Sequence, residues 1–253
     1  MSILQANFYS DSLNRQTAFS AVIPMGSKKP LKTLYLLHGL GGNFMDWLTC
    51  TRIAYWAYGR NLAVIMPSGD NSFYLDNEKA LAMYGDFFGR ELVEATRELF
   101  PLSDKREDTF IAGLSMGGYG AIRTGLKYHK TFGALAGLSS ALVTEDAVNF
   151  TNATPTIIGR RSYFESVFGD LDKLSGSDKD PKKLITELKS TGADIPAIYL
   201  CCGTEDFLIQ HSRDFHSFLE AQGVPHTYAE CAGDHNWEYW DANILKVLEW
   251  LPI

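Results

Sequence analysis

The sequence predicts an α/β protein built on a mainly parallel, eight-stranded sheet with helices on both faces. Short apolar runs that end at glycine or proline recur along the 253 residues, which is typical of strands buried on both sides. Between these runs lie longer segments whose apolar residues recur at three- and four-residue spacing, the period of a helix packed on one face. Strands and helices that alternate in this way favour a parallel sheet.

The strands are predicted from apolar and β-branched runs bounded by turn formers. The run KTLYLLHG ends at a glycine and NLAVIMP ends at a proline, so both indicate buried strands. The run TFGALAGLS is the weakest case, because its alanines and glycines also suit a helix or close packing. The predicted strands are 3–10 as an edge strand, 17–24, 32–39, 61–67, 108–113, 131–139, the segment from 196 onward, and 226–231.

Three segments have a helical pattern. Residues 81–100 carry an apolar stripe from Tyr84 to Phe100, and residues 208–222 precede Gly223, where a helix would stop. Residues 242–251 form an apolar closing helix, with Asp241 as the expected N-cap. Residues 141–195 contain no convincing strand and include the polar run SGSDKDPKK. Such an insertion is either a cap over a site or surface decoration, and we expect a mostly helical cap within a single domain spanning 1–253.

Charge and cysteine usage restrict the partners and the compartment. The net charge of −7 argues against nucleic acid or an anionic membrane surface as a partner. No secretory leader or membrane-spanning run is visible, and Cys50, Cys201, Cys202 and Cys231 form no CxxC pair. We therefore expect a cytoplasmic protein with reduced thiols. No zinc-binding spacing of histidines or cysteines is present, so we expect neither a metal nor a cofactor.

One serine lies in a pattern that indicates nucleophilic chemistry. Gly113-Leu114-Ser115-Met116-Gly117 is a G-x-S-x-G pentapeptide between the predicted strand DTFIA and a helical segment. In a strand–turn–helix context this pattern forms a nucleophile elbow, which exposes a strained serine at the edge of the sheet. Small residues two positions before and after the serine give the bend its clearance. The rival interpretation is a tight turn without chemistry.

A serine hydroxyl needs a base, and the base needs an orienting acid. His235 follows the last predicted strand, where the base stands in folds that carry this elbow. The loop CCGTEDFL follows the preceding strand and offers two acids; we prefer Asp206, with Glu205 as the alternative. Asp234 adjoins His235, but neighbours in an extended loop point in opposite directions.

The tetrahedral intermediate of acyl transfer needs hydrogen-bond donors for its oxyanion. The backbone N–H of Met116, directly after the serine, is one candidate. The loop HGLGGN after the strand at 32–39 supplies the other, and we choose the N–H of Leu40, with Gly41 as its neighbour. His38 is expected to brace this loop rather than to transfer protons.

These segments together resemble the esterase D–like branch of the α/β-hydrolases, which includes tributyrin esterases, S-formylglutathione hydrolases, and feruloyl and acetyl-xylan esterases. The resemblance extends over most of the chain and implies the α/β-hydrolase fold and a short-chain carboxylic ester hydrolase. It places Ser115, Asp206 and His235 at the triad positions and the amides of Leu40 and Met116 at the oxyanion positions. The segments that carry it are YLLHGLGGNFMDW, VIMPSGDNSFY, FIAGLSMGGYGA, GTEDF and GDHNWEYW.

The expected substrate is a small-molecule ester, and a phenolic ester is a further option. Among the aromatic residues near the site in sequence, Trp47 and Trp237 are the best candidates to line the substrate pocket, and residues 141–195 are expected to set the acyl-chain length. The same triad would serve an S-formylglutathione hydrolase-like thioesterase or an acyltransferase. The formylglutathione hydrolases carry HGLTC where this chain has HGLGG, which weighs against that thioester. A homo-oligomer, dimer or tetramer, is also considered.

Overall fold

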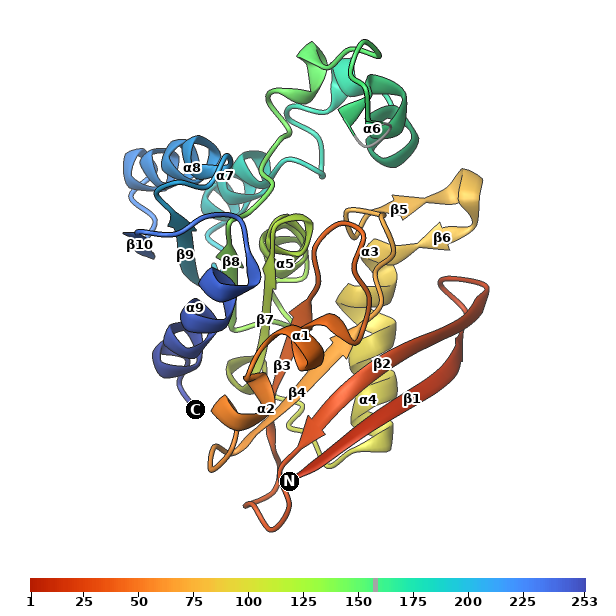
Figure 1. The fold of residues 1–253 in the computed structure, drawn as a ribbon, viewed down its shortest axis with the longest axis vertical. Coiled ribbons are helices and arrows are strands. Elements are labelled where there is room, and N and C mark those ends of the chain that lie inside the picture. Colours follow the sequence, from red (N-terminus) through yellow and green to blue (C-terminus); the bar gives the residue numbers. More distant parts are fainter. Residues whose placement is uncertain (157–158) are drawn as a thin grey trace.

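A computed structural model describes residues 1–156 and 159–253. Its main sheet has eight strands in the order β1-β2-β4-β3-β7-β8-β9-β10 (Figure 1). The strands from β3 and β4 through β10 pair in parallel, whereas β1–β2 and β2–β4 pair antiparallel. The predicted mainly parallel sheet is confirmed. The strands are β1 Ser2–Ser10, β2 Arg15–Ile23, β3 Lys32–Leu37, β4 Leu62–Pro67, β7 Thr109–Leu114, β8 Ala134–Leu138, β9 Ala197–Gly203 and β10 Thr227–Cys231.

A separate two-stranded ribbon was not predicted. Strands β5 (Asp76–Asn77) and β6 (Ala82–Met83) pair antiparallel around a 3₁₀ turn at Glu78–Ala80. Each strand has two residues, so a two-residue hydrophobic period cannot reveal it.

The three segments with a helical pattern, 81–100, 208–222 and 242–251, are helical apart from their ends, whereas the short helices at Asp46–Cys50 and Ile53–Trp56 were not predicted. The segment 81–100 is helical from Tyr84, and Phe87–Glu91 form a π-helical turn. A π turn takes in an extra residue and so rotates the next helical turns onto a different face; accordingly Leu99 is exposed and Phe100 lies outside the helix. The helices are α1 Asp46–Cys50, α2 Ile53–Trp56, α3 Tyr84–Asp86, α4 Leu92–Leu99, α5 Met116–Lys127, α6 Arg161–Phe168, α7 Pro181–Thr191, α8 Ile209–Ala221 and α9 Trp237–Trp250.

The predicted N-cap of the last helix was wrong. Helix α9 begins five residues earlier than expected, and its cap is Asn236, whose Oδ1 accepts the N–H of Tyr239 at 2.9 Å. Asp241 lies inside α9 and instead accepts the N–H of Arg52, at the start of α2, at 2.7 Å. The earlier start has a functional consequence, because it places the base candidate His235 directly before a helix.

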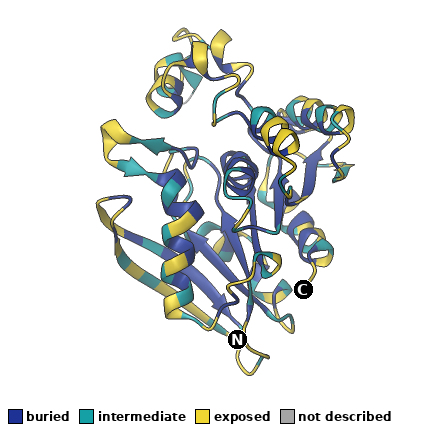
Figure 2. Cartoon of the chain, turned by 180° about the vertical axis from the view of Figure 1, so that it is seen from behind, coloured by how far each residue is buried: buried dark blue, intermediate teal, exposed yellow. Residues whose placement is uncertain are grey.

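Alternate residues of the central strands pack into two layers. On β3, Leu34 and Leu36 face a cluster that includes Trp47 of α1 and Ile244 of α9. Tyr35 and Leu37 face the opposite cluster, which contains residues of α4, α5, α7 and α8. The strands are thus apolar on both faces, and Figure 2 shows the central strands as buried. Packing on both faces holds the sheet in place, and the sheet in turn positions the loops at its edge.

The described residues of 141–195 contain helices α6 and α7 and no strand, as expected, but turns and loops make up much of the segment. Helix α6 stands apart from the sheet next to the β5–β6 ribbon, and much of its surface is exposed (Figures 1 and 2). Helix α7 is different, because it packs against α5 and so belongs to the helical layer that covers the sheet. Across residues 1–156 and 159–253, no helix has the length and apolar character that a membrane crossing requires.

Candidate active site

The sequence-predicted site residues meet at one edge of the sheet. Ser115 follows β7, the loop that begins with His38 follows β3, Asp206 follows β9 and His235 follows β10. The carboxyl ends of parallel strands lie at the same edge, which is where α/β folds build their sites.

Ser115 occupies a strained backbone conformation. Its φ of 54° and ψ of −118° lie in a region that non-glycine residues rarely adopt and that costs about 1–3 kcal/mol. Strain of this kind persists where neighbouring structure fixes it. Here the N–H of Ser115 donates to Leu138 O at 2.9 Å, and its carbonyl accepts the N–H of Ala141 at 3.0 Å. The end of β8 therefore pins the bend.

The glycines around Ser115 provide room for this bend. A Cβ at Gly117 would lie 2.5 Å from the carbonyl oxygen of His38 and 2.6 Å from that of Leu37. A Cβ at Gly113 would overlap the backbone of Gly117. The clearance inferred from the pentapeptide is therefore present as backbone contacts, which a larger side chain could not avoid.

The Ser115 hydroxyl reaches His235, and His235 reaches Asp206. His235 Nε2 lies 3.0 Å from Ser115 Oγ, and His235 Nδ1 lies 2.8 Å from Asp206 Oδ2. An ionised carboxylate only accepts hydrogen bonds, so Nδ1 carries the proton and Nε2 is free to accept from the serine. The rings of Phe207 and Trp240 lie 4.6 and 4.9 Å from the imidazole and restrict its rotation.

Asp206 is buried but held in its ionised form. Burial raises its pKa, but hydrogen bonds from His235, from the Leu208 N–H and from Ser139 outweigh that effect and lower the pKa below its ordinary value. Ser139 is fully buried behind the carboxylate, and its Oγ accepts the indole N–H of Trp240 at 3.2 Å. The carboxylate can therefore stabilise an imidazolium at neutral pH.

Two backbone N–H groups are available beside Ser115. Met116 is the first residue of α5, so its N–H has no acceptor within the helix, and the positive end of the helix dipole points to the same place. Leu40 lies in the loop after β3, and its N–H has no hydrogen-bond partner within the described residues. These donors are the two that the sequence predicted.

His38 braces the loop that carries Leu40. Its Nε2 accepts the N–H of Gly69 at 2.8 Å, so the proton is on Nδ1, which donates to Gly39 O at 2.7 Å. Burial is the main reason why the pKa of His38 is lowered, which keeps the ring neutral. Both nitrogens are occupied within the protein, which agrees with a bracing role.

The comparisons with known proteins agree with this geometry. Residues 10–251 match the Esterase family, described as "Putative esterase", and an "Acetyl esterase" from Caldicellulosiruptor saccharolyticus is 45% identical over 99% of this chain and 98% of the relative. The chain belongs to this esterase family. It is a carboxylic ester hydrolase with the α/β-hydrolase fold.

Two solved structures from Staphylococcus aureus resemble the esterase over its length. The fluorophosphonate-binding serine hydrolase FphF superposes with a TM-score of 0.89 at 30% identity, covering 99% of this chain and 98% of that one. The S-formylglutathione hydrolase FrmB superposes with a TM-score of 0.86 at 31% identity, with the same coverage. A ferulic acid esterase at 20% identity and a TM-score of 0.79 shares the fold.

A cleft of about 570 Å³ opens above Ser115 in the esterase. Trp237 lines it, as expected. Trp47 does not: it is buried beneath the cleft, donates its indole N–H to Leu37 O at 3.0 Å, and packs edge-on against Trp237 at 5.6 Å. The cleft-lining residues are Gly39, Leu40, Gly41, Gly42, Asp46, Leu114, Ser115, Phe207, His235, Asn236, Trp237 and Trp240. None comes from 141–195, so the expected cap does not form a wall of this cleft.

The other acids of these loops have structural contacts. Glu205, the alternative to Asp206, accepts the N–H of Gly233 at 2.5 Å and faces solvent. Asp234 accepts the backbone N–H of His235 at 2.7 Å and not its ring. Neither contacts the imidazole nitrogens, so only Asp206 is placed to orient the base.

Sequence reasoning missed two polar residues of the cleft, and it did not choose Phe207 and Trp240 among the aromatic candidates. Asp46, the first residue of α1, lines the cleft with its carboxylate folded toward Gly42. Asn236, the cap of α9, lines it beside His235. Asp46 adjoins Trp47 within the segment that carries the family resemblance, but proximity along the chain does not show which of two neighbours faces the cleft. The N-cap preference of asparagine was the available signal for Asn236.

Proposed function

We propose that the esterase hydrolyses short-chain acyl esters through an acyl-enzyme formed on Ser115. The observation that supports this most directly is the continuous chain from Ser115 Oγ through the His235 ring to buried Asp206, with separations of 3.0 and 2.8 Å. The C. saccharolyticus relative, which is named an acetyl esterase, supports a short acyl group.

In the proposed mechanism Ser115 Oγ attacks the carbonyl carbon of the ester while its proton passes to His235 Nε2. The negative charge that forms on the carbonyl oxygen is stabilised by the N–H groups of Leu40 and Met116. Collapse of the intermediate breaks the bond to the alcohol oxygen, which takes the proton from His235. Water then attacks the acyl carbon by the same route, with Asp206 stabilising the imidazolium in both halves. No step requires a cofactor.

The residues that line the cleft favour uncharged esters with an apolar or aromatic alcohol. Phe207, Trp237 and Trp240 supply aromatic surface, and the Asp46 carboxylate adds a negative charge. A phenolic ester fits these surfaces, whereas an anionic leaving group would be repelled by Asp46 at close range.

The second candidate is a thioesterase for S-formylglutathione, favoured by the 31% identity to FrmB. The same triad would also support acyl transfer to an alcohol in place of water. We rank the thioesterase below ester hydrolysis, because glutathione carries carboxylates and the cleft contains Asp46. Rates with S-formylglutathione, and product ratios with an added alcohol, separate the three activities.

The primary test is hydrolysis of p-nitrophenyl esters from acetate to octanoate by the wild type and by Ser115→Ala. We expect the highest kcat/KM for the shortest acyl groups, and a loss in Ser115→Ala of at least about 10³-fold. Undiminished hydrolysis by a folded Ser115→Ala protein would refute the role of Ser115. A preference for octanoate would refute the short-acyl assignment.

We also propose that the enzyme acts in a reducing compartment such as the cytoplasm. Support for this compartment comes from its cysteines, which are all free; Cys201 and Cys202 are buried. For its assembly we propose a homo-oligomer, either a dimer or a tetramer. Light scattering of the purified protein determines the oligomeric state.

A further inference from the structure

The loop at 38–43, which carries Leu40, is called the oxyanion loop below. The loop between β4 and β5 contacts it at three points. The N–H of Gly69 donates to His38 Nε2 at 2.8 Å, and the hydroxyl of Tyr74 donates to His38 O at 2.7 Å. The N–H of Gly41 donates to Asn71 Oδ1 at 2.7 Å. These contacts come from the segment PSGDNSFY, to which the proposed reaction assigns no part.

The backbone of this loop is strained rather than loose. Asp70, Phe73 and Tyr74 have positive φ values of 45°, 50° and 59°, each of which costs a non-glycine residue free energy. Phe73 and Tyr74 are buried, and the Tyr74 ring fills the space beside Gly69 and Gly120. Burial of these rings holds the loop in one conformation, so Asn71 projects from a fixed base.

Asn71 and His38 hold the oxyanion loop on either side of Leu40. His38 fixes the chain before Leu40 through its ring and its carbonyl. Asn71 fixes the next peptide through the N–H of Gly41, whose φ of 78° marks the sharp turn of the loop. Asn71 is the only side chain among the described residues that accepts the Gly41 N–H. Without it, the peptide after Leu40 could rotate toward water.

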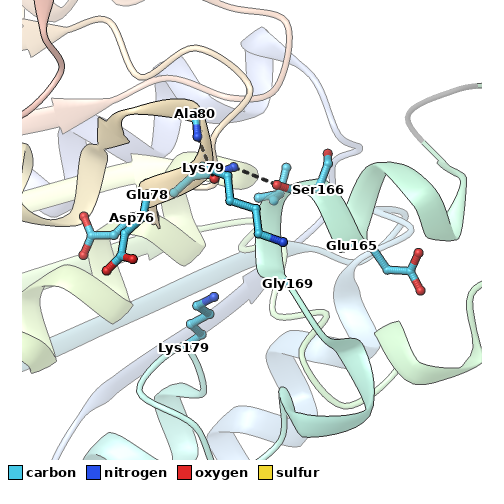
Figure 3. Close-up of a pocket in the computed structure, with 10 residues that line it drawn as sticks. Asp76, Glu78, Lys79, Ala80, Glu165, Ser166, Gly169 and Lys179 are labelled. Carbon is cyan, nitrogen blue, oxygen red and sulfur yellow. Dashed lines mark hydrogen bonds between the residues drawn. The ribbon is translucent and has the colours of Figure 1, made fainter.

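Asn71 is also tied to the inserted helix α6. The backbone carbonyl of Asn71 accepts a hydrogen bond from the hydroxyl of Tyr163 at 3.0 Å. A second contact comes from Asn77 of the β5–β6 ribbon, whose side-chain amide donates to Ser166 O at 2.9 Å. Around these contacts the ribbon and α6 are separated by open space, with a cavity of about 580 Å³ lined by charged residues (Figure 3). Helix α6 meets this loop in two ways: Phe164 and Phe168 pack against Phe73, with ring centroids 5.9 and 4.9 Å apart, and Tyr163 makes the polar contact with Asn71.

From these contacts we infer that Asn71 is a positioning residue of the oxyanion hole, and that Tyr163 of α6 holds Asn71 in place. The inference rests on the proposed function, because it assumes that the Leu40 N–H binds the oxyanion. Asn71 does not line the cleft, so it acts through Gly41 and not on the substrate.

The test measures the acylation rate constant and the substrate dissociation constant Kd from burst-phase kinetics of Asn71→Ala with p-nitrophenyl acetate, together with its thermal unfolding. A net hydrogen bond corresponds to a factor of about 3–10 in rate, so we expect acylation to slow about three- to tenfold. The dissociation constant Kd of the substrate, taken from the same burst-phase data, should change less than twofold, because the contact matters for the transition state. Tyr163→Phe, which loses the donor to Asn71 O, should slow acylation about two- to threefold.

Two further variants separate this role from general loop stability. Asn71→Asp keeps an acceptor at the same exposed position, so it should recover most of the rate lost in Asn71→Ala. Asn43→Ala removes another loop asparagine, whose Oδ1 accepts the Met45 N–H at 2.8 Å, and it should leave the acylation rate within twofold.

A wild-type acylation rate constant in Asn71→Ala, an equal loss in Asn43→Ala, or a change confined to the dissociation constant Kd of the substrate would overturn the inference. Modification of Ser115 by a fluorophosphonate, detected by mass spectrometry, tests the proposed function independently. If Ser115 reacts in all variants but acylation is unchanged in Asn71→Ala, then the inference fails while the proposed function stands.

Discussion

Replacing Gly117 by alanine tests whether the shape of the serine bend controls both stability and rate. The added Cβ would lie 2.5 Å from His38 O and 2.6 Å from Leu37 O. Both obstacles are backbone atoms at the end of β3, so no side-chain rotation can relieve the contact. The carbonyl of His38 also accepts the Tyr74 hydroxyl at 2.7 Å, and that bond opposes any movement.

The size of this overlap sets the expected magnitude. Carbon and oxygen atoms must separate to at least 3.0 Å, so the end of β3 must shift by about 0.5 Å. Overpacking of this kind costs about 1–3 kcal/mol, and we expect a net loss near 2 kcal/mol, which lowers Tm by about 5 °C in a chain of this size. The shift passes directly to Leu40, two residues after His38. A displacement of about 1 Å can cost 10²-fold in rate, so kcat should fall about tenfold or more.

The assay is p-nitrophenyl acetate hydrolysis combined with calorimetric unfolding. Gly125→Ala is the matched control, since it lies in the same helix and its Cβ would first meet the side-chain end of Leu135 at 2.8 Å. We expect the control to keep kcat within twofold and to lose less stability. If Gly117→Ala matches Gly125→Ala in both kcat and Tm, then the steric account of the bend is wrong.

Three further predictions concern the acid and the cleft. Asp206→Asn should lower kcat about 10³- to 10⁴-fold. The pKa of Asp206 is lowered in the folded protein, so its ionised form adds stability above about pH 4, and this stability is lost as the pH falls through the lowered pKa. The difference in unfolding free energy between the wild type and Asp206→Asn, measured by urea titration, should therefore shrink below about pH 4. A difference that stays constant with pH would contradict this. Asp46→Asn should raise the ratio of kcat/KM for 3-carboxyphenyl acetate to that for phenyl acetate about threefold, and an unchanged ratio would show that the carboxylate does not face the leaving group. Trp237→Ala should raise KM for p-nitrophenyl acetate severalfold, whereas Trp47→Phe should mainly lower Tm; the reverse pattern would restore Trp47 as a substrate contact.

The chemistry of the site could be predicted because it depends on local features of the chain. Gly113 and Gly117 are required by contacts within a few residues of Ser115 or with the adjacent strand, and chain order placed His235 and Asp206 after neighbouring strands. A parallel sheet then brings these loops together without further information. The fold and the candidate triad thus follow from turn chemistry and from the hydrophobic period.

The remaining features depend on packing between segments far apart in the chain. Asp241 satisfies the N-cap rule but lies inside α9, where its carboxylate bonds to Arg52 nearly two hundred residues earlier. Trp47 has the large aromatic side chain that is typical of a binding residue, but it packs under Trp237. The position of α6 beside the β5–β6 ribbon, rather than over Ser115, likewise depends on contacts such as that of Tyr163 with Asn71.

The pair of acids in GTEDF shows why two similar side chains have different tasks. The N–H groups of Thr204 and Glu205 donate to Cys231 O and Gly233 O at 3.0 and 3.1 Å, and the Glu205 carboxylate accepts the Gly233 N–H in return. The loop that carries the acid is therefore bonded directly to the loop that carries the base. These three bonds together hold the two loops side by side, with Asp206 within hydrogen-bond distance of the His235 ring. The alternative acid is thus a structural partner of the preferred one.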